Sequence, residues 1–439
     1  MNSIGTKIKL LGDNRKYERW RGQIFGITWL AYFGFYLTRK AFSVAKIGID
    51  QDATIDLTSS QMAWVDGAYL VAYAVGQFVW GVAGDKVGTR KVVLAGMLCS
   101  VLAAFAMGAS SITIALGIFF CIQGLCQSTG WAPLVKNVAN FFSQRERGVV
   151  MGFWCTNYAV GGLVASIYAG YWGDRLGWRY AFFVPAVTLF AIWILFIFFQ
   201  RNRPEDVGLQ PIEEYHSEKE AVLVKGEKPE EENAGDWKTI FEVLTNRNVL
   251  LLSAVYFLLK PTRYAILFWG PKYINEKLGS GMTESGLISS MFELAGIFSV
   301  LVGGYVSDKF FGARRMPVCV ICLLSLGLFL FFLDDLPATR LVLSASLLLI
   351  GFLLYAPDSL VSGTAAIDFG TKKGASTAAG FINGAGSVGA IIGGTIPGFF
   401  AAQWGWNGVF MFLASMVLLA GVILLPKWNT LPSTADNNP

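Results

Sequence analysis

Twelve runs of mainly apolar residues follow one another along the 439-residue chain, separated by short polar connections and one long polar insert. A helix needs about 20 apolar residues to cross the hydrocarbon core of a bilayer, at a rise of about 1.5 Å per residue. Helices are favoured there because hydrocarbon offers the backbone no outside hydrogen-bond partner. The sequence therefore predicts an all-α membrane protein with twelve transmembrane helices. The runs lie near residues 23–49, 60–83, 92–109, 112–139, 149–171, 180–199, 249–269, 286–306, 318–333, 341–367, 375–401 and 408–425.

Overall composition supports this class and argues against others. Hydrophobic residues make up 54% of the chain and charged residues only 15%, whereas soluble domains carry about 25% charged residues. Basic residues are scattered between the apolar runs, so we expect no nucleic-acid surface. The single histidine, His216, lies in the polar insert, and the chain contains no nucleotide-binding glycine motif. We therefore expect no metal, no cofactor and no enzymatic activity.

Basic residues mark one side of the membrane, because connections rich in lysine and arginine alternate with connections that lack them. The rule that basic connections stay inside places both termini and the polar insert in the cytoplasm. The insert, residues 201–247, is rich in Glu and Lys and is interpreted as a solvated linker between an N-terminal half, 1–200, and a C-terminal half, 248–439. Its end, 236–244, alternates like a short interfacial amphipathic helix.

A repeated motif indicates that the two halves are related. Gly81-Val-Ala-Gly-Asp85-Lys86-Val-Gly88-Thr-Arg90-Lys91 follows the second run, and Gly304-Tyr-Val-Ser-Asp308-Lys309-Phe-Phe-Gly312-Ala-Arg314-Arg315 follows the eighth. The same pattern at the same place in each half predicts two six-helix halves. The spacing resembles the loop signature of the major facilitator superfamily, in which such halves rock about a midplane site. We expect Asp85, Arg90, Asp308 and Arg314 to hold helix ends and to act in gating.

The first run predicts an arginine inside the membrane. Residues 24–38 are only 15 apolar residues, so the span is complete only if Arg39 and Lys40 lie within it. An arginine at the bilayer centre costs at least roughly 2.5–3.5 kcal/mol and marks a functional site. The alternative is an arginine at a helix end whose long side chain reaches the membrane surface.

The seventh run repeats this pattern in the second half. Its first apolar segment, 249–259, has 11 residues, so the helix must continue through Lys260 and Arg263, which share a face. Because the seventh run corresponds to the first, a pseudo-two-fold axis would bring Arg39 and Arg263 to opposite walls of a central cavity. Two guanidinium groups can each bind a phosphate or a carboxylate through two hydrogen bonds. An anion between them would draw the halves together.

Other buried charges and aromatic residues are expected near the two arginines. Buried ions need partners, so Glu293 and Asp358 are candidates to neutralise Lys40 or Lys260, either as structural pairs or in contact with substrate. Lys40 is interpreted as a structural or gating charge. We expect five tyrosines to line the cavity beside the arginines, namely Tyr32, Tyr36, Tyr73, Tyr158 and Tyr355.

Several motifs, found in order along nearly the whole chain, resemble those of the organophosphate:phosphate antiporters. This family includes bacterial glycerol-3-phosphate and hexose-6-phosphate transporters and a related membrane sugar-phosphate sensor. The motifs include Tyr36-Leu-Thr-Arg39-Lys40, Gly130-Trp131-Ala-Pro133, Phe142-Ser-Gln-Arg145-Glu146-Arg147-Gly148, Arg203-Pro-Glu-Asp-Val-Gly208 and Glu293-Leu-Ala-Gly296.

The resemblance implies a function that spacing alone does not define. It implies that Arg39 and Arg263 bind the phosphate of a small phosphorylated metabolite, and that inorganic phosphate leaves as this substrate enters. It further implies a monomeric protein of the bacterial inner membrane. Two alternatives remain open: a sugar-phosphate sensor that signals to a partner kinase, and a transporter of other organic anions such as carboxylates.

Five positions depart from the family pattern. Tyr158 stands where the family has a histidine, Gln77 replaces a lysine, Lys260 replaces an aromatic residue and Phe268 replaces an aspartate. Asp358 stands where the family is apolar. These changes leave the organic part of the substrate open, and the added lysine and aspartate are compatible with a zwitterionic phosphoester or phosphonate.

Overall fold

The computed structural model describes residues 2–55, 57–143, 150–151, 153–215, 245–312, 314–364 and 375–430. In the N-terminal half, the helices are α1 (Asn2–Arg39), α2 (Ala41–Asp50), α3 (Ser59–Val87), α4 (Thr89–Ala109), α5 (Thr113–Gln127), η1 (Ser128–Gly130), α6 (Trp131–Phe141), α8 (Thr156–Leu176) and α9 (Tyr180–Phe199). In the C-terminal half, they are α13 (Arg247–Leu278), α14 (Met282–Phe311), α15 (Arg315–Phe331), α16 (Arg340–Ser359), η3 (Leu360–Thr364), α18 (Ala375–Leu424) and η4 (Leu425–Lys427).

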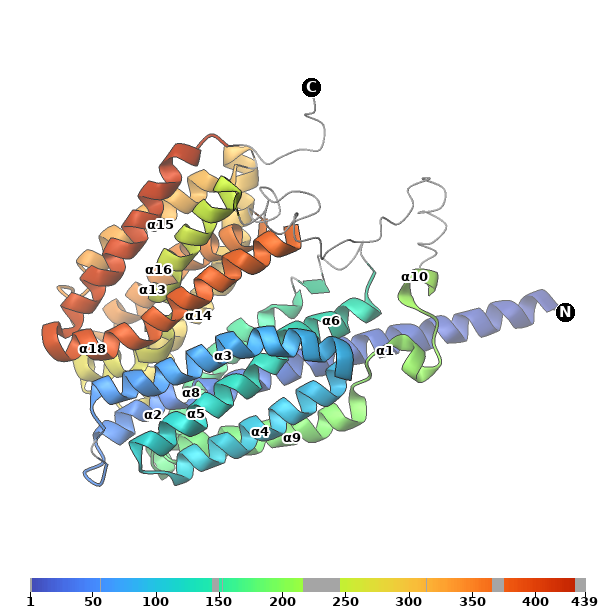
Figure 1. Cartoon of the computed structure of the whole chain (residues 1–439), viewed down its shortest axis with the longest axis horizontal. Coiled ribbons are helices and arrows are strands. Elements are labelled where there is room, and N and C mark those ends of the chain that lie inside the picture. Colours follow the sequence, from blue (N-terminus) through green and yellow to red (C-terminus); the bar gives the residue numbers. More distant parts are fainter. Residues whose placement is uncertain are drawn as a thin grey trace.

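Taken in chain order, the helices of the described residues follow the twelve predicted spans. Within the described residues, eight helical segments are long and apolar enough to cross a membrane by length and composition, and the last of these, Gly380–Lys427, covers the two predicted runs 375–401 and 408–425. The eleventh and twelfth spans form one helical stretch that is divided at Gly405 (Figure 1). Gly405 has a φ of 65°, a left-handed conformation that glycine adopts without steric cost.

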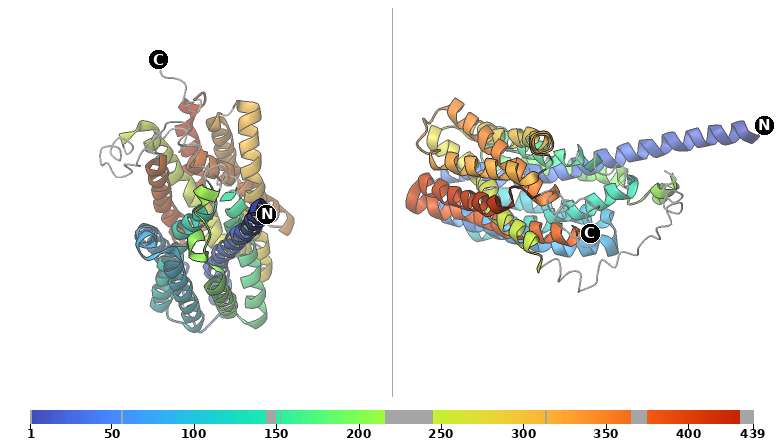
Figure 2. Two further views of the ribbon diagram at one scale, coloured as in Figure 1. Left: turned by 90° about the vertical axis from the view of Figure 1, so that its right-hand side faces the viewer. Right: turned by 90° about the horizontal axis from the view of Figure 1, so that it is seen from above.

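The first span differs from its prediction at its start, while its end agrees within one residue. The run was predicted to begin at residue 23, whereas α1 begins at Asn2, and its N-terminal part projects beyond the other helices (Figure 2). Only Lys40 separates α1 from α2. The hydrogen bonds of Lys40 N to Tyr36 O (3.1 Å) and of Val44 N to Lys40 O (3.4 Å) carry the helical path across this point. Arg39 and Lys40 therefore lie inside the span.

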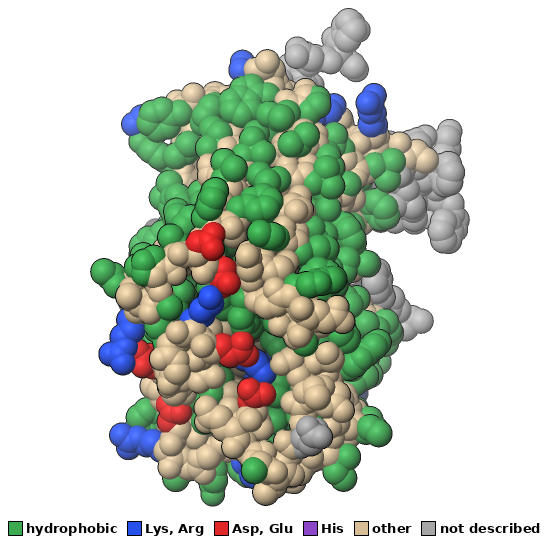
Figure 3. All heavy atoms as spheres, turned by 90° about the vertical axis from the view of Figure 1, so that its left-hand side faces the viewer, with side chains coloured by type: hydrophobic (Ala, Val, Ile, Leu, Met, Phe, Trp, Pro, Cys, Tyr) green, Lys and Arg blue, Asp and Glu red, His purple; other side chains and the backbone are tan. Residues whose placement is uncertain are grey.

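The two halves lie side by side and meet at one end of the molecule. This end carries the connection between α2 and α3 and the break in α18, and is called the α2 end below (Figure 1). Here α14 packs along α8, α18 along α3, and α13 against α2. The ribbons diverge toward the opposite end, from which α1 projects. Figure 3 views the α2 end, where groups of acidic and basic side chains interrupt a surface of hydrophobic and uncharged ones.

Glycines allow the closest approach between the halves. A Cβ atom at Gly170 of α8 would lie 2.5 Å from the carbonyl oxygen of Met282 at the start of α14, so a larger residue cannot be accommodated without movement. Small residues are common where membrane helices pack closely. Two backbone hydrogen bonds cap the same contact, because the Asp174 carboxylate accepts from Met282 N (2.8 Å) and Thr283 N (2.6 Å).

The beginning of the polar insert is structured and packs on α1. The insert contains η2 (Pro204–Val207) and α10 (Ile212–Tyr215). The rings of Tyr17 and Tyr215 stack with centroids 3.9 Å apart, and the Tyr17 hydroxyl donates to Gln210 O at 3.0 Å. Aromatic stacking and satisfied carbonyls hold this segment in place. The amphipathic stretch predicted at 236–244 lies outside the described residues.

Candidate anion site between the halves

Arg39, the last residue of α1, is buried among aromatic rings and a neutral amide. Its side chain donates from Nε to Gln127 Oε1 at 3.2 Å. The guanidinium carbon lies 4.4 Å from the ring centroid of Tyr36 and 4.7 Å from that of Tyr73, within the range of cation–π attraction. Its buried Nη2 has no hydrogen-bond partner among the described residues. Arg39 therefore keeps a donor available for an anion.

Gln127 holds Arg39 through a buried hydrogen-bond network. Its Oε1 also accepts from the Tyr69 hydroxyl at 2.8 Å, while its Nε2 donates to Thr38 Oγ1 at 2.9 Å and to Ser100 Oγ at 3.2 Å. Because these contacts fix the orientation of the amide, the position of the Arg39 Nε is fixed as well. Neither Gln127 nor Tyr69 was predicted. The available signals were an amide within an apolar run and a tyrosine one helical turn before Tyr73.

Arg263 differs from Arg39 because its charge is compensated within its own half. Arg263 Nη1 donates to Asp358 Oδ2 at 2.6 Å, and Lys260 Nζ lies 2.9 Å from Asp358 Oδ1. Lys260 and Arg263 stand on one face of α13, and Asp358 lies near the end of α16. The Arg263 guanidinium carbon is 4.7 Å from the Tyr355 ring centroid and 5.7 Å from that of Tyr158. The carboxylate thus lies between two cations.

Two tyrosines connect the surroundings of the two arginines. Tyr36, which stacks against Arg39, also packs closely on α8, because a Cβ atom at Gly161, three residues after Tyr158, would lie 2.9 Å from the Tyr36 Cβ. Tyr158 is half-buried and packs against hydrophobic clusters of both halves. The structure therefore brings Arg39 and Arg263 to the same central region, together with Tyr36, Tyr73, Tyr158, Tyr355 and Lys260.

Tyr32 packs beside Tyr73 and two tryptophans. It is only 3% exposed and packs in an aromatic cluster, with ring centroids 5.4 Å from Trp131 and 5.7 Å from Trp154. Its hydroxyl approaches the Tyr73 hydroxyl at 3.5 Å. The helical spacing placed Tyr32 and Tyr36 on one face correctly, but Tyr32 lies one turn away and supports Tyr73 from within the packed core.

Lys40 points from the N-terminal half into the C-terminal half. Its Nζ pairs with Glu293 Oε1 at 2.8 Å and donates to the Leu267 carbonyl at 3.0 Å, and Ser43 Oγ donates to the same carbonyl at 3.1 Å. This carbonyl is available because Pro271, four residues later in α13, has no backbone N–H to bond it within the helix. A proline therefore creates an acceptor for the opposite half.

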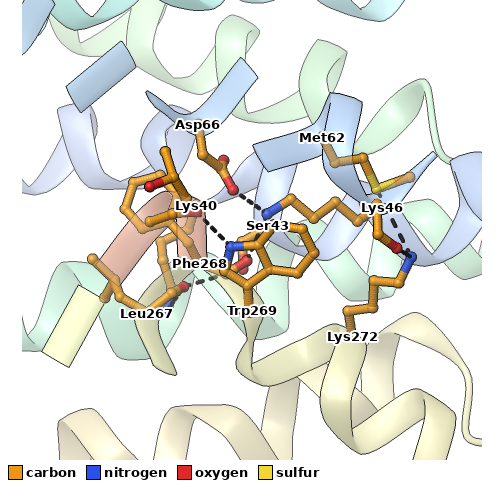
Figure 4. A network of polar contacts seen from close by, with 12 residues as sticks. Lys40, Ser43, Lys46, Met62, Asp66, Leu267, Phe268, Trp269 and Lys272 are labelled. Atoms are coloured by element: carbon orange, nitrogen blue, oxygen red, sulfur yellow. Dashed lines mark hydrogen bonds and ion pairs between the residues drawn. The ribbon is translucent and has the colours of Figure 1, made fainter. Parts of the chain in front are cut away.

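Lys46 makes a second contact across the halves (Figure 4). It forms a short ion pair with Asp66 of α3, and both side chains are fully buried. Its Nζ also donates to the Phe268 carbonyl of α13 at 3.0 Å and lies 3.8 Å from the Trp269 ring centroid. Lys46 was not predicted as a site residue, although it follows Arg39 by two helical turns.

Lys272 makes the reverse contact, from the C-terminal to the N-terminal half. Its Nζ lies 3.1 Å from both Asp50 Oδ1 of α2 and Ser59 Oγ of α3. Lys40, Lys46 and Lys272 are called the cross-half lysines below. All three join α13 or α14 to the first two spans, and all lie between the arginines and the α2 end. Their partners in the opposite half are more than 200 residues away in sequence, so no local pattern identified these contacts.

The residues predicted to hold helix ends are only partly described. The backbone N–H of Arg90 donates to Asn202 Oδ1 at 2.9 Å, and its guanidinium donates to the carbonyl of Ile197 at the end of α9. Arg314 Nη1 lies 3.4 Å from Asn429 Oδ1. The side chains of Asp85 and Asp308 lie outside the described part of the structure. Among the described residues, no group of three or more potential metal ligands comes together.

Comparison with known proteins identifies the family. The model of the Major Facilitator Superfamily matches residues 28–369 and 278–439, and the chain belongs to this superfamily. It is therefore an integral membrane protein of the predicted fold class: all-α, with twelve transmembrane helices in two six-helix halves. A solved bacterial homologue of the human lysosomal transporter Spinster, inward-facing and unoccupied, shares this fold with a TM-score of 0.72 at 13% identity, covering 93% of this chain and 95% of that one.

Relatives with curated names confirm the resemblance to organophosphate transporters. The chain is 31% identical over 440 residues to the glycerol-3-phosphate transporter of Bacillus subtilis, covering 96% of each protein. It is 30% identical over 427 residues to the probable hexose phosphate transport protein of Chlamydia trachomatis, covering 94% of this chain and 92% of that protein. It is also 28% identical over 422 residues to the membrane sensor protein UhpC of Salmonella typhimurium, covering 94% and 93%.

Proposed function

We propose that this protein is a secondary transporter that exchanges a small organophosphate, of the glycerol-3-phosphate or hexose-6-phosphate type, for inorganic phosphate by alternating access. The observation that supports this proposal is the pair Arg39 and Arg263: each lies within the first span of its half, and each lies beside tyrosine rings. The names of the relatives support a phosphate ester, which is common to the hexose phosphate and glycerol-3-phosphate proteins.

In this mechanism, each arginine supplies part of the phosphate site. Arg39 contributes donors that its aromatic surroundings leave available, and Arg263 contributes the guanidinium nitrogens that Asp358 does not engage. Charge-assisted, bidentate bonds to phosphate from both sides would reduce the repulsion between the halves and favour their approach. Tyr36, Tyr73, Tyr158 and Tyr355 shape the walls, and Lys260 adds a further positive charge.

Alternating access then requires the α2 end to open. The contacts of Lys40 with Glu293, and those of Lys46 and Lys272, must break and reform in each cycle. We propose that the halves 1–200 and 248–439 move as bodies joined by the linker 201–247. The basic connections support both termini being cytoplasmic in a bacterial inner membrane, with the protein acting as a monomer. The α2 end would then face outward.

Reconstitution tests this function directly. Liposomes preloaded with labelled phosphate should release it when glycerol-3-phosphate or glucose-6-phosphate is offered outside. Arg39→Lys and Arg263→Lys should each lower exchange about 100-fold or more, because lysine cannot make the bidentate bonds of arginine. The matched control is Arg340→Lys, an exposed arginine away from the site. Full exchange by both site variants, or no counterflow with any phosphoester, would contradict the proposal.

A second candidate is a sensor that binds a sugar phosphate without transporting it, which the identity to the sensor protein UhpC favours. Thermal stabilisation of the purified protein by glucose-6-phosphate, with no counterflow in the same preparation, would support sensing. Inhibition of exchange by carboxylates, with no effect of phosphate, would instead support an organic-anion transporter.

A further inference from the structure

An acidic residue lies inside the cationic site, and its position needs a reason. Asp358 contacts both Lys260 and Arg263, and the three side chains are 9%, 11% and 14% exposed respectively. They are therefore partly exposed, unlike the fully enclosed pair of Lys46 and Asp66. A carboxylate at this place opposes the binding of any anion. The carboxylate is compatible with a site that prefers an anion of limited charge.

The ionised groups around the site define that limit. Arg39, Arg263 and Lys260 supply three positive charges and Asp358 one negative charge, which leaves +2. Two neighbouring lysines do not alter this sum, because Lys40 is paired with Glu293 and Lys46 with Asp66. A phosphate monoester carries close to two negative charges above its second pKa of about 6. A dianion therefore neutralises the site, whereas a trianion leaves an excess negative charge in a partly dry environment.

We propose that Asp358 determines substrate charge: it restricts the site to dianionic phosphate monoesters with an uncharged organic group and excludes phosphorylated carboxylates. This inference rests on the proposed transport function and concerns the same site. Specificity here comes from a repulsive element, the carboxylate, added to the attractive arginines. Arg263 can still bind phosphate, because Nη1 is the only one of its guanidinium nitrogens with a hydrogen bond to Asp358 in the described structure.

Charge-altering variants change the sum in both directions. Asp358→Asn raises the site to +3, and Lys260→Met lowers it to +1. The double variant Lys260→Met/Asp358→Asn restores +2 without the ion pair. If charge selects the substrate, the double variant behaves like the original protein. If the ion pair itself selects the substrate, the double variant behaves like neither the original protein nor the single variants.

The experiment compares three external substrates for phosphate counterflow at about pH 8, where phosphate monoesters are dianionic. They are glycerol-3-phosphate, 3-phosphoglycerate with an additional carboxylate, and phosphoethanolamine with an ammonium group. We expect the original protein to prefer glycerol-3-phosphate. Asp358→Asn should shift the ratio of 3-phosphoglycerate to glycerol-3-phosphate exchange upward by about tenfold or more, since one unit charge acts over a short distance in a partly buried site. Lys260→Met should shift the ratio downward, and the double variant should restore it.

The ratio is measured within one preparation, so it does not depend on how much protein folds. In Lys260→Met, Asp358 stays paired with Arg263. This variant therefore tests the effect of site charge even where Asp358→Asn folds poorly. Unchanged ratios in the single variants overturn the inference while leaving phosphoester exchange intact. A preference of the original protein for phosphoethanolamine also overturns it, because Asp358 would then recognise an ammonium group. Absence of exchange with every phosphoester overturns the proposed function and this inference together.

Discussion

At the scale of single residues, the two arginines that occupy equivalent positions have unequal surroundings. Arg39 rests on tyrosine rings and one amide oxygen, whereas Arg263 has a carboxylate at 2.6 Å. A carboxylate compensates a buried charge far better than a ring face or an amide. An incoming anion therefore stabilises Arg39 more than Arg263, because Arg263 already has an anionic partner in Asp358.

The amide of Gln127 is expected to determine how well Arg39 binds. Gln127→Leu removes its bond to Nε and leaves the Tyr69 hydroxyl without an acceptor. Hydrogen bonds to charged groups contribute about 1.5–3 kcal/mol, so the phosphate concentration for half-maximal exchange should rise roughly 10- to 100-fold. Measurement is by counterflow at graded substrate concentrations.

Gln123→Leu provides the control for this prediction. Gln123 lies one turn earlier in α5 and is equally buried, but its side chain has no hydrogen-bond partner among the described residues. Its substitution should leave exchange unchanged. An equal loss in both variants would show that the helix, and not the bond to Arg39, was disturbed.

At the scale of elements, α2 and α13 are joined by lysines whose partners combine carboxylates with backbone carbonyls. Lys46→Met should lower the thermal stability of the purified protein markedly, because Asp66 would stay buried without its cation. Breaking a buried pair from one side costs about 3–5 kcal/mol. The double variant Lys46→Met/Asp66→Asn should recover most of this loss, since it leaves no unpaired charge.

Lys272→Met provides the comparison for that pair. Its partner Asp50 is 47% exposed and water can replace the contact, so the expected loss is at most about 1 kcal/mol. Thermal unfolding in detergent measures all of these variants. A Lys46→Met protein as stable as the original would show that the buried pair contributes nothing to the assembly of α2, α3 and α13.

Much of this element-level arrangement could be predicted from hydropathy, and part could not. Arg39 and Arg263 were identified because each interrupts an apolar run too short to span a membrane alone. Lys40, Glu293 and Asp358 were recognised as buried charges, but their pairing depends on how helices far apart in the sequence pack together. Gln127 carries no charge, and its one local signal, an amide within an apolar run, does not indicate that it bonds Arg39. The break in α18 at Gly405 falls between the runs predicted at 375–401 and 408–425, and only the positive φ of Gly405 lies outside what hydropathy contains.

At the scale of the whole molecule, the contact between α8 and α14 is where the proposed opening of the α2 end can be tested. Cysteines replacing Asp174 and Thr283 should form a disulfide under oxidation, because the Asp174 carboxylate lies 2.6 Å from Thr283 N. We expect oxidation to abolish exchange and a reductant to restore it, since a closed α2 end prevents alternation of the two halves. The measurement is phosphate counterflow before and after each treatment.

Each single cysteine variant serves as the control and should exchange phosphate regardless of oxidation. The oxidised double variant should still bind phosphate, because the arginines are unaffected. This binding is measured as thermal stabilisation of the protein by phosphate. Undiminished exchange by a protein whose disulfide has formed would mean that the halves do not separate at this end.

The proline at position 271 has a consequence for the solvent as well as for the fold. When the α2 end opens, the Leu267 carbonyl loses Lys40 and Ser43, and its own helix has no N–H to offer in their place. A water molecule must occupy that position, because an unsatisfied buried carbonyl is costly. Opening is therefore a hydration step for α13, so the balance between the two states of the transporter depends on water activity. Osmolytes that withdraw water favour the closed α2 end.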